Sequence, residues 1–125
     1  MTATSNEALK VALAYFQAMA NKDVDGIMTL VHDGIACFNP NGDFEGSERF
    51  RAFEDGFARM IEKLTLMKAF GDERQAVIVY ACDTLPVKNS YVAEHLTVEA
   101  GKITSCRVIY DSAPYAAYMA SRPKH

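Results

Sequence analysis

The sequence predicts an α+β domain in which helices pack against one face of a curved, mainly antiparallel β-sheet. In the first half of the chain, apolar residues recur at the spacing typical of amphipathic helices. In the second half, they alternate as they do in half-buried strands. Short connections that contain Gly or Pro join these strand-like segments, and such connections favour an antiparallel meander.

Three helices are expected: residues 6–21, a short helix that begins at Asp23, and about 48–62 with Ser47 as the N-cap. The apolar stripe of the first helix consists of Leu9, Ala12, Leu13, Phe16, Met19 and Ala20, with Tyr15 on its flank. The short helix repeats at helical spacing through Val24, Ile27, Met28 and Val31. The stripe of the third helix is Phe50, Phe53, Phe57, Met60 and Leu64.

Residues 33–46, between the second and third helices, predict a short buried strand followed by a turn. Because strand side chains alternate, Ile35, Cys37 and Asn39 fall on one face of the strand. The segment 39–42 ends the strand, since Pro lacks an amide donor and Asn-Gly tolerates positive φ. Asn39 is therefore expected at the rim or floor of a pocket.

Four further strands are expected at about 63–70, 74–84, 89–99 and 102–110. Residues 112–122 are expected to form a tail with one helical turn, to which Tyr115, Tyr118 and Met119 contribute. The chain of 125 residues is expected to be a single domain, residues 1–125, with a core of about 6–111 and a tail of 112–125. A chain of this length can bury a core without disulfides or a metal.

The composition argues against several classes of protein. A net charge of −3 and a pI near 5.5 do not favour binding to nucleic acid or to an anionic membrane, because both require a basic patch. No segment reaches the roughly 18 apolar residues of a membrane span, and residues 1–6 are too polar for a signal peptide. With neither feature present, the protein is expected to be cytoplasmic. Cys37, Cys82 and Cys106 lie in apolar strand patterns, which predicts buried reduced thiols.

Glu94 is the leading candidate for chemistry. It shares one face of the strand 91–98 with apolar side chains, namely Val92, Leu96 and Val98. Desolvation on such a face raises the pKa of a carboxyl, which could then act as a general acid or donate a hydrogen bond to a ligand carbonyl. The alternatives are a different strand register, or an ion pair of Glu94 with Arg74 or Arg107 at a sheet end.

The next strand places Thr104, Cys106, Val108 and Tyr110 on one face. If that face points inward, the phenol of Tyr110 reaches the same cavity; the alternative is a core Tyr whose hydroxyl is satisfied at the edge. No metal site is expected, because His95 alternates to the face opposite Glu94 and His32 ends a short helix. The sequence contains no Cys/His cluster, Gly-rich phosphate loop or nucleophile elbow.

The chain resembles the SnoaL-like branch of the nuclear transport factor 2-like superfamily over about residues 6–111. The resemblance rests on the element order and on short patterns: Tyr15-Phe16-x-Ala18, Asp23-Val24-Asp25-Gly26-Ile27 and Asn39-Pro40-x-Gly42-x-Phe44-x-Gly46. It implies the cystatin-like fold of that group, a cone-shaped curved sheet that three helices close around one apolar pocket. It also implies a homodimer and a site that needs no cofactor.

Ketosteroid isomerase and polyketide cyclases belong to this group. The isomerase uses a Tyr from the first helix, an Asp base just before a Pro, and a late-strand Asp that an apolar site keeps protonated. By position, Tyr15 matches the Tyr, Glu94 matches the late-strand acid, and Asn39 stands where the base would be. Because an amide cannot abstract a proton, the resemblance implies that the base is lost from its usual place.

Three hypotheses follow. The first is an isomerase, cyclase or dehydratase for a small apolar, carbonyl-bearing or polycyclic molecule, with Glu94 as acid or base and with Tyr15 and Asn39 holding the substrate oxygen. The expected pocket walls are Phe53, Phe57, Met60, Cys37, Cys106, Val108 and Tyr110. The second is a pocket that binds a ligand without catalysis. The third is a domain that fills its own cavity and works by dimerising, through an outer sheet face that carries Tyr91, Ile103 and Ile109.

Overall fold

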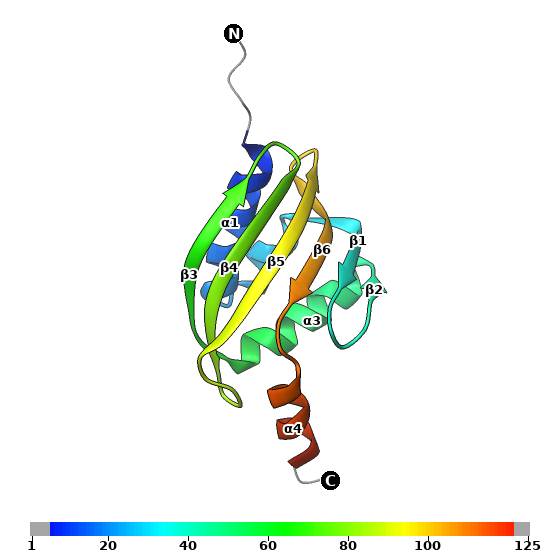
Figure 1. Ribbon diagram of the computed structural model, residues 1–125. Helices are drawn as coiled ribbons and strands as arrows, with labels where there is room; N and C mark the ends of the chain where they lie inside the picture. The colour runs from blue at the N-terminus through cyan, green and yellow to red at the C-terminus, as the bar shows by residue number, and fades with distance from the viewer. Residues whose placement is uncertain (1–5, 122–125) are drawn as a thin grey trace.

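In the computed structural model, residues 6–121 are described and form four helices and one six-stranded curved sheet that does not close into a barrel (Figure 1). The elements are α1 (Glu7–Ala20), α2 (Val24–Met28), β1 (Val31–Phe38), β2 (Phe44–Glu45), α3 (Ser47–Met60), β3 (Ile61–Gly71), β4 (Gln75–Thr84), β5 (Ser90–Glu99), β6 (Lys102–Ile109) and α4 (Ala113–Ser121). This architecture confirms the predicted fold class. None of the helices within residues 6–121 is long and apolar enough to cross a membrane.

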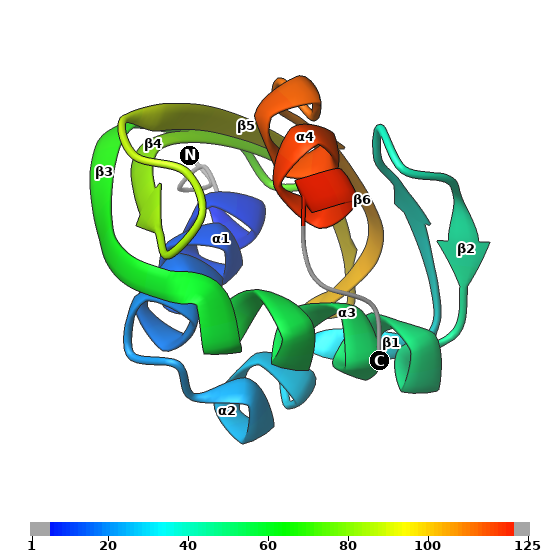
Figure 2. The ribbon, with the colours of Figure 1, turned by 90° about the horizontal axis from the view of Figure 1, so that it is seen from below.

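The sheet has the strand order β2-β1-β6-β5-β4-β3. All neighbouring strands pair antiparallel except β1 and β6, which run parallel. Helix α1 packs against β3, β4 and β5, whereas α3 packs against β1 and β2. Both helices therefore cover the inner side of the curve, and α4 lies at one end of the space between α3 and the sheet (Figure 2).

Strict alternation of side chains builds the core on the inner face. On β4, the buried residues are Ala76, Ile78, Tyr80, Cys82 and Thr84. On β5, they are Val92, Glu94, Leu96 and Val98, so Glu94 lies inward as the alternation predicts. The three cysteines are buried and unpaired, which agrees with the predicted reduced thiols.

The buried side of α1 is rotated relative to the predicted stripe. Leu13 is 40% exposed, whereas Tyr15, expected on the flank, is fully buried. The helix faces the sheet with Ala8, Ala12 and Tyr15, which recur at i, i+4 and i+7. The two alanines have no bulk beyond Cβ, so the helix backbone can approach the strands and carry the Tyr15 phenol deep into the core.

The prediction that Ile103 lies on the outer sheet face is wrong. Ile103 is fully buried, because the β5–β6 register shifts: Thr97 pairs with Ser105, but the next residue, Val98, pairs with Ile103. The extra residue, Thr104, forms a β-bulge that reverses the alternation toward the start of β6.

Several element boundaries also differ from the prediction. Helix α2 ends at Met28, and Val31 begins β1 instead of extending the helix. Ser47 is the first residue of α3; the cap position is Gly46, whose φ of 102° favours glycine. Asp23 caps α2 as predicted, accepting a hydrogen bond from the Gly26 amide at 2.9 Å.

The tail, residues 112–125, differs most from the prediction. Instead of one helical turn, the chain forms the nine-residue helix α4. The last part of the expected tail, residues 122–125, lies outside the described residues. The helix count is therefore four in the described part of the chain, where three had been expected.

The observed orientation of α1 can be tested by comparing Leu13 on this helix with Leu96 on β5. Leu96→Ala should lower the free energy of unfolding by about 2–5 kcal/mol, because Leu96 is fully buried and the change leaves a cavity. Leu13→Ala should cost less than about 1 kcal/mol, since Leu13 lies on the exposed side of α1. Urea denaturation followed by circular dichroism measures both; equal losses would contradict the observed orientation of α1.

Candidate functional site

A cavity of about 530 Å³ lies between α3, the inner face of β4–β6, and α4. Helix α3 forms one wall and the strands form the opposite one. Its lining residues are Met19, Asn41, Ala52, Phe53, Glu54, Gly56, Phe57, Arg59, Met60, Tyr80, Val92, Glu94, Val108, Tyr110, Tyr115 and Tyr118. The volume argues against the third hypothesis, in which the domain fills its own cavity.

Most of the predicted walls lie in this lining. Phe53, Phe57 and Met60 come from α3, and Val108 and Tyr110 from the end of β6. Helix α4 adds aromatic rings that the sequence had not assigned to the pocket, among them Tyr115, which packs edge-on against Tyr110 at a centroid distance of 5.6 Å. The pocket is therefore closed at this end by the tail.

Glu94 lies at the floor of the pocket and is 2% exposed. Tyr15 and Tyr80 donate hydrogen bonds to its two carboxyl oxygens, Tyr15 to Oε1 at 2.7 Å and Tyr80 to Oε2 at 2.5 Å. The Cys106 thiol donates to Oε1 at 3.3 Å. Burial raises the pKa of Glu94, and these hydrogen bonds act in the opposite direction by stabilising the ionised form.

The alternative ion pairs for Glu94 do not form. Within residues 6–121, neither Glu54 nor Glu94 takes part in an ion pair with Lys, Arg or His. Arg107 instead stacks over the Phe38 ring, with its guanidinium 4.6 Å from the ring centre.

Glu54 is a buried acid that the sequence prediction missed. It is 2% exposed, lines the pocket from α3, and lies 2.8 Å from the Tyr15 hydroxyl through Oε1. Burial and the neighbouring Glu94 raise the pKa of Glu54 to about 8. The signal was present in the spacing, because Glu54 stands four residues after Phe50 and three before Phe57, on the apolar side of α3.

Tyr80 was also missed. Its position on β4, between Ile78 and Cys82 in an alternating apolar run, predicts an inward side chain. It is 1% exposed and lines the pocket beside Glu94. Burial and the adjacent Glu94 raise the pKa of Tyr80 well above its ordinary value, which keeps the phenol protonated as a donor.

The structure does not bring Asn39 into the pocket. Its Nδ2 donates to the Gly42 carbonyl at 2.8 Å and its Oδ1 accepts from the Asn41 amide at 2.9 Å, so the side chain closes its own turn. The neighbouring Asn41 reaches the pocket instead and donates through Nδ2 to the Tyr110 hydroxyl at 2.8 Å. The expectation that Asn39 holds a substrate oxygen is therefore not supported.

Three other predicted residues lie behind the pocket surface. Tyr15, Cys37 and Cys106 are fully buried and are not among the lining residues. Cys37 and Cys106 are register partners on β1 and β6. Tyr15 contacts Glu54 and Glu94 from the interior, and Cys106 contacts Glu94. Both residues can therefore support the pocket floor, but neither lines the cavity.

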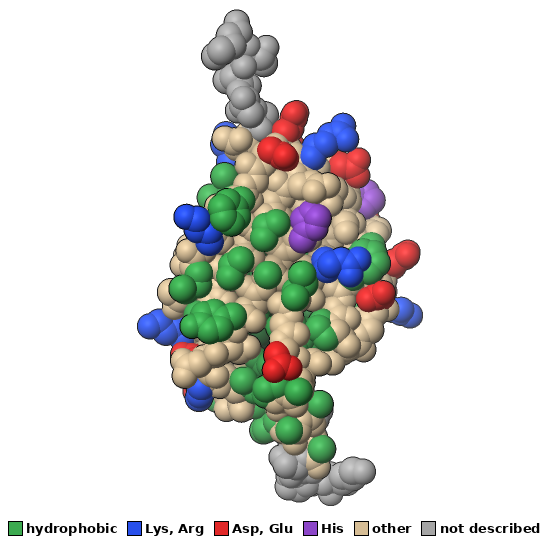
Figure 3. Space-filling model, in the orientation of Figure 1, with side chains coloured by type: hydrophobic (Ala, Val, Ile, Leu, Met, Phe, Trp, Pro, Cys, Tyr) green, Lys and Arg blue, Asp and Glu red, His purple; other side chains and the backbone are tan. Residues whose placement is uncertain are grey.

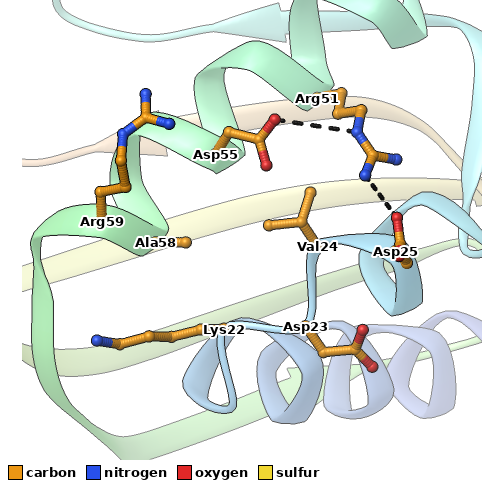
Figure 4. A pocket seen from close by; sticks show the side chains of 8 residues that line it. All are labelled: Lys22, Asp23, Val24, Asp25, Arg51, Asp55, Ala58 and Arg59. Atoms are coloured by element: carbon orange, nitrogen blue, oxygen red, sulfur yellow. Dashed lines mark hydrogen bonds and ion pairs between the residues drawn. The ribbon is translucent and has the colours of Figure 1, made fainter.

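A second hollow lies between α2 and α3 and is lined by charged side chains (Figure 4). Arg51 bridges Asp25 and Asp55 across it, and these side chains are 46%, 84% and 42% exposed. Exposed ion pairs of this kind contribute little and are screened by salt. In the described part of the chain, no three His, Cys, Asp or Glu side chains could hold a metal ion.

The pKa of Glu54 makes stability depend on pH. The unfolded state loses this proton near ~4.3, whereas the folded state keeps it to about 8, so stability should fall as pH rises between these values. Glu54→Gln removes this loss, on the order of 3–5 kcal/mol, and flattens the curve. Urea denaturation between pH 5 and 9 measures it, with Glu48→Gln on the exposed side of α3 as the control. Parallel curves for wild type and Glu54→Gln would contradict the raised pKa.

Comparison with known proteins gives the family. The family model of the SnoaL-like domain matches residues 12–106. A crystal structure of a protein from Kribbella flavida DSM 17836 is 40% identical, covers 94% of this chain and 98% of its own, and superposes with a TM-score of 0.90. No curated protein matches the sequence.

More distant structures share the fold. A candidate ketosteroid isomerase from Kribbella flavida is 13% identical, with a TM-score of 0.77 and coverage of 97% of this chain and 84% of that one. A candidate polyketide cyclase from Silicibacter sp. is 18% identical, with a TM-score of 0.75 and coverage of 98% and 100%. These two structures show a shared fold, and the family match over residues 12–106 confirms the resemblance seen in the sequence: the chain belongs to the SnoaL-like domain family.

Proposed function

We propose that the protein binds a small apolar molecule, carbonyl-bearing or polycyclic, and that Glu94 performs acid–base chemistry on it. One observation carries the proposal: a buried carboxyl lines a cavity whose other walls are mainly aromatic and aliphatic. The volume of about 530 Å³ lies within the range of about 300–1,000 Å³ that small-molecule sites occupy. Such a reaction is an isomerisation, cyclisation or dehydration that needs no cofactor.

The surroundings of Glu94 suit proton transfer. Burial raises the pKa of Glu94, and a higher pKa makes its carboxylate a stronger base. A positioned acid or base contributes about 10²–10⁴-fold to a rate. The low dielectric of the pocket strengthens its interaction with a ligand oxygen. Fold-level likeness to isomerase and cyclase candidates supports this proposal only by analogy.

The second candidate function is ligand binding without turnover. One observation favours it: Asn39 stands where the isomerase base is expected, and its amide is used within the turn 39–42. In that case Glu94 and Tyr80 would only orient a ligand against the aromatic walls.

The conservative change Glu94→Gln separates the two functions. The probe is 2-tetralone, a bicyclic ketone, and the readout is exchange of its α-protons for deuterium, followed by NMR. Wild type should accelerate exchange, and Glu94→Gln should lose about 100-fold or more of that acceleration. The rise in melting temperature with 2-tetralone should change little, because the apolar walls remain.

The results for wild type alone also distinguish the two functions. A rise in melting temperature without exchange in wild type would favour the binding function. No rise and no exchange would count against the acid–base proposal for ketones of this size. Glu48→Gln is the matched control and should behave as wild type in both measurements.

We also propose a homodimer through the outer face of the sheet. Tyr91, Ile109 and Phe70 lie on this face and are 63%, 55% and 56% exposed. The half-buried Val77 and Val79 of β4 lie between them. Figure 3 shows apolar side chains gathered over this face. Contiguous exposed apolar surface of this kind is typical of an interaction site. The cytoplasmic location expected from the sequence stays a prediction.

Ile109→Lys tests the dimer. Wild type should sediment as a dimer at micromolar concentration, and the variant as a monomer, because a charge would be buried at the interface. Leu85→Lys is the control, since Leu85 is 63% exposed in the connection after β4, outside the sheet face. A monomeric wild type at high concentration would refute the proposal.

A further inference from the structure

We infer that Glu54 is the second acid of this site, and that Glu54 and Glu94 share one proton through Tyr15, with Glu54 neutral and Glu94 ionised. The catalytic consequence of this sharing rests on the proposed function. The sharing itself is a property of the ligand-free protein and can be tested without any ligand.

The Tyr15 hydroxyl has too few protons for both of its contacts with the acids. The Tyr15 hydroxyl oxygen lies 2.8 Å from Glu54 Oε1 and 2.7 Å from Glu94 Oε1. A phenol carries a single proton, so it can donate to only one of these oxygens. The other contact needs a proton from the carboxyl, because two oxygens without a hydrogen between them repel at this distance. One of the two acids is therefore protonated and donates to Tyr15.

The remaining contacts decide which acid keeps the proton. Glu94 accepts from Tyr80 and from Cys106, in addition to Tyr15. Hydrogen bonds donated to a carboxylate stabilise its ionised form. Glu94 is therefore the ionised member, Tyr15 donates to it, and Glu54 donates its own proton to the Tyr15 oxygen. The pKa of Glu54, raised to about 8 by burial and by Glu94, agrees with this assignment.

Arg59 is the cation among the residues that line the pocket with Glu54 and Glu94, and it forms no ion pair with either acid. The groups that hydrogen-bond to the pair are Tyr15 of α1, Tyr80 of β4 and Cys106 of β6. The thiol of Cys37 and the carboxylate of Asp55 act on Glu54 from a greater distance, and both raise its pKa. Within residues 6–121, no cation forms an ion pair with either acid. Two uncompensated carboxylates in this apolar interior would be costly, and one shared proton reduces the buried charge from two to one.

This arrangement supplies both halves of an acid–base reaction. In an enolisation, the proton on the α-carbon would pass to the Glu94 carboxylate, while Glu54 would give its proton to the carbonyl oxygen. The product is an enol, with Glu94 neutral and Glu54 ionised. Tyr15 then restores the starting state, because it can accept the proton of Glu94 and donate its own to Glu54. Glu94 would thereby perform the base role that Asn39 cannot.

The test is a titration of the ligand-free protein labelled with ¹³C at the glutamate carboxyls, read by NMR. Wild type, Glu54→Gln and Glu94→Gln assign the two signals, and Glu48→Gln is the control on the same helix. In wild type, the Glu54 signal should stay protonated above pH 7 while Glu94 is ionised. Glu94→Gln should lower the pKa of Glu54 by about one unit or more, because the negative neighbour is removed.

Two results would overturn the inference. One is that both acids titrate near ~4.3, each unaffected by substitution of the other. The other is that Glu94 keeps the proton while Glu54 is ionised. If a Gln variant does not fold, Tyr15→Phe replaces it: loss of the bridging hydroxyl should shift both titrations, and unchanged titrations would equally refute the sharing. Failure of 2-tetralone exchange would refute the proposed reaction, but it would not affect the conclusion that Glu54 and Glu94 share a proton.

Discussion

The contact of one phenol with two buried carboxyls is the interaction on which the rest of this structure depends. Tyr15 reaches from α1 to Glu54 on α3 and to Glu94 on β5, so it joins three elements in an apolar interior. Buried acids are costly unless they are hydrogen-bonded. In the described residues, no buried side-chain nitrogen or oxygen lacks a partner. Removing one member of the cluster would therefore leave another without its compensation.

The curvature of the sheet determines where this cluster lies. The register shifts in the β3–β4 and β5–β6 pairs, and bulges of this kind increase local twist, while the β1–β6 pairing is interrupted between Val31 and Ala36. The curved sheet and α3 leave space between them, and the acids lie at its floor. The lining is mainly aromatic and aliphatic and both acids are 2% exposed, so their charges interact strongly. Helix α4 completes the enclosure, which makes the chain's last described helix part of the pocket.

The family fold hosts different functions, so the chemistry depends on which side chains occupy the floor. In this chain, the position expected to hold a base carries Asn39, whose amide stabilises a turn. A second carboxyl, Glu54 of α3, lies at the floor with Glu94 and within hydrogen-bond distance of the same Tyr15 hydroxyl. The pocket therefore retains two acids even though one expected position has been lost.

The sequence by itself determined the fold class, the family and the inward position of Glu94. The fold class and the inward position of Glu94 depend on local periodicity, because side chains alternate along a strand and recur every 3.6 residues along a helix. The family was indicated by a resemblance in element order and in short sequence patterns. The same periodicity indicated the burial of Tyr80 and Glu54, although neither was chosen as a site residue before their partners were visible.

Only the tertiary structure decided which polar groups meet. Tyr15 bonds to acids 39 and 79 residues away, and nothing in local spacing specifies such pairs. The bulge at Thr104 moved Ile103 into the core, because one extra residue reverses strand alternation. The turn 39–42 withdrew Asn39 from the pocket, and the packing of α4 placed Tyr115 in it. Periodicity fixes the face on which a side chain lies, but its partner is set by how the faces pack together.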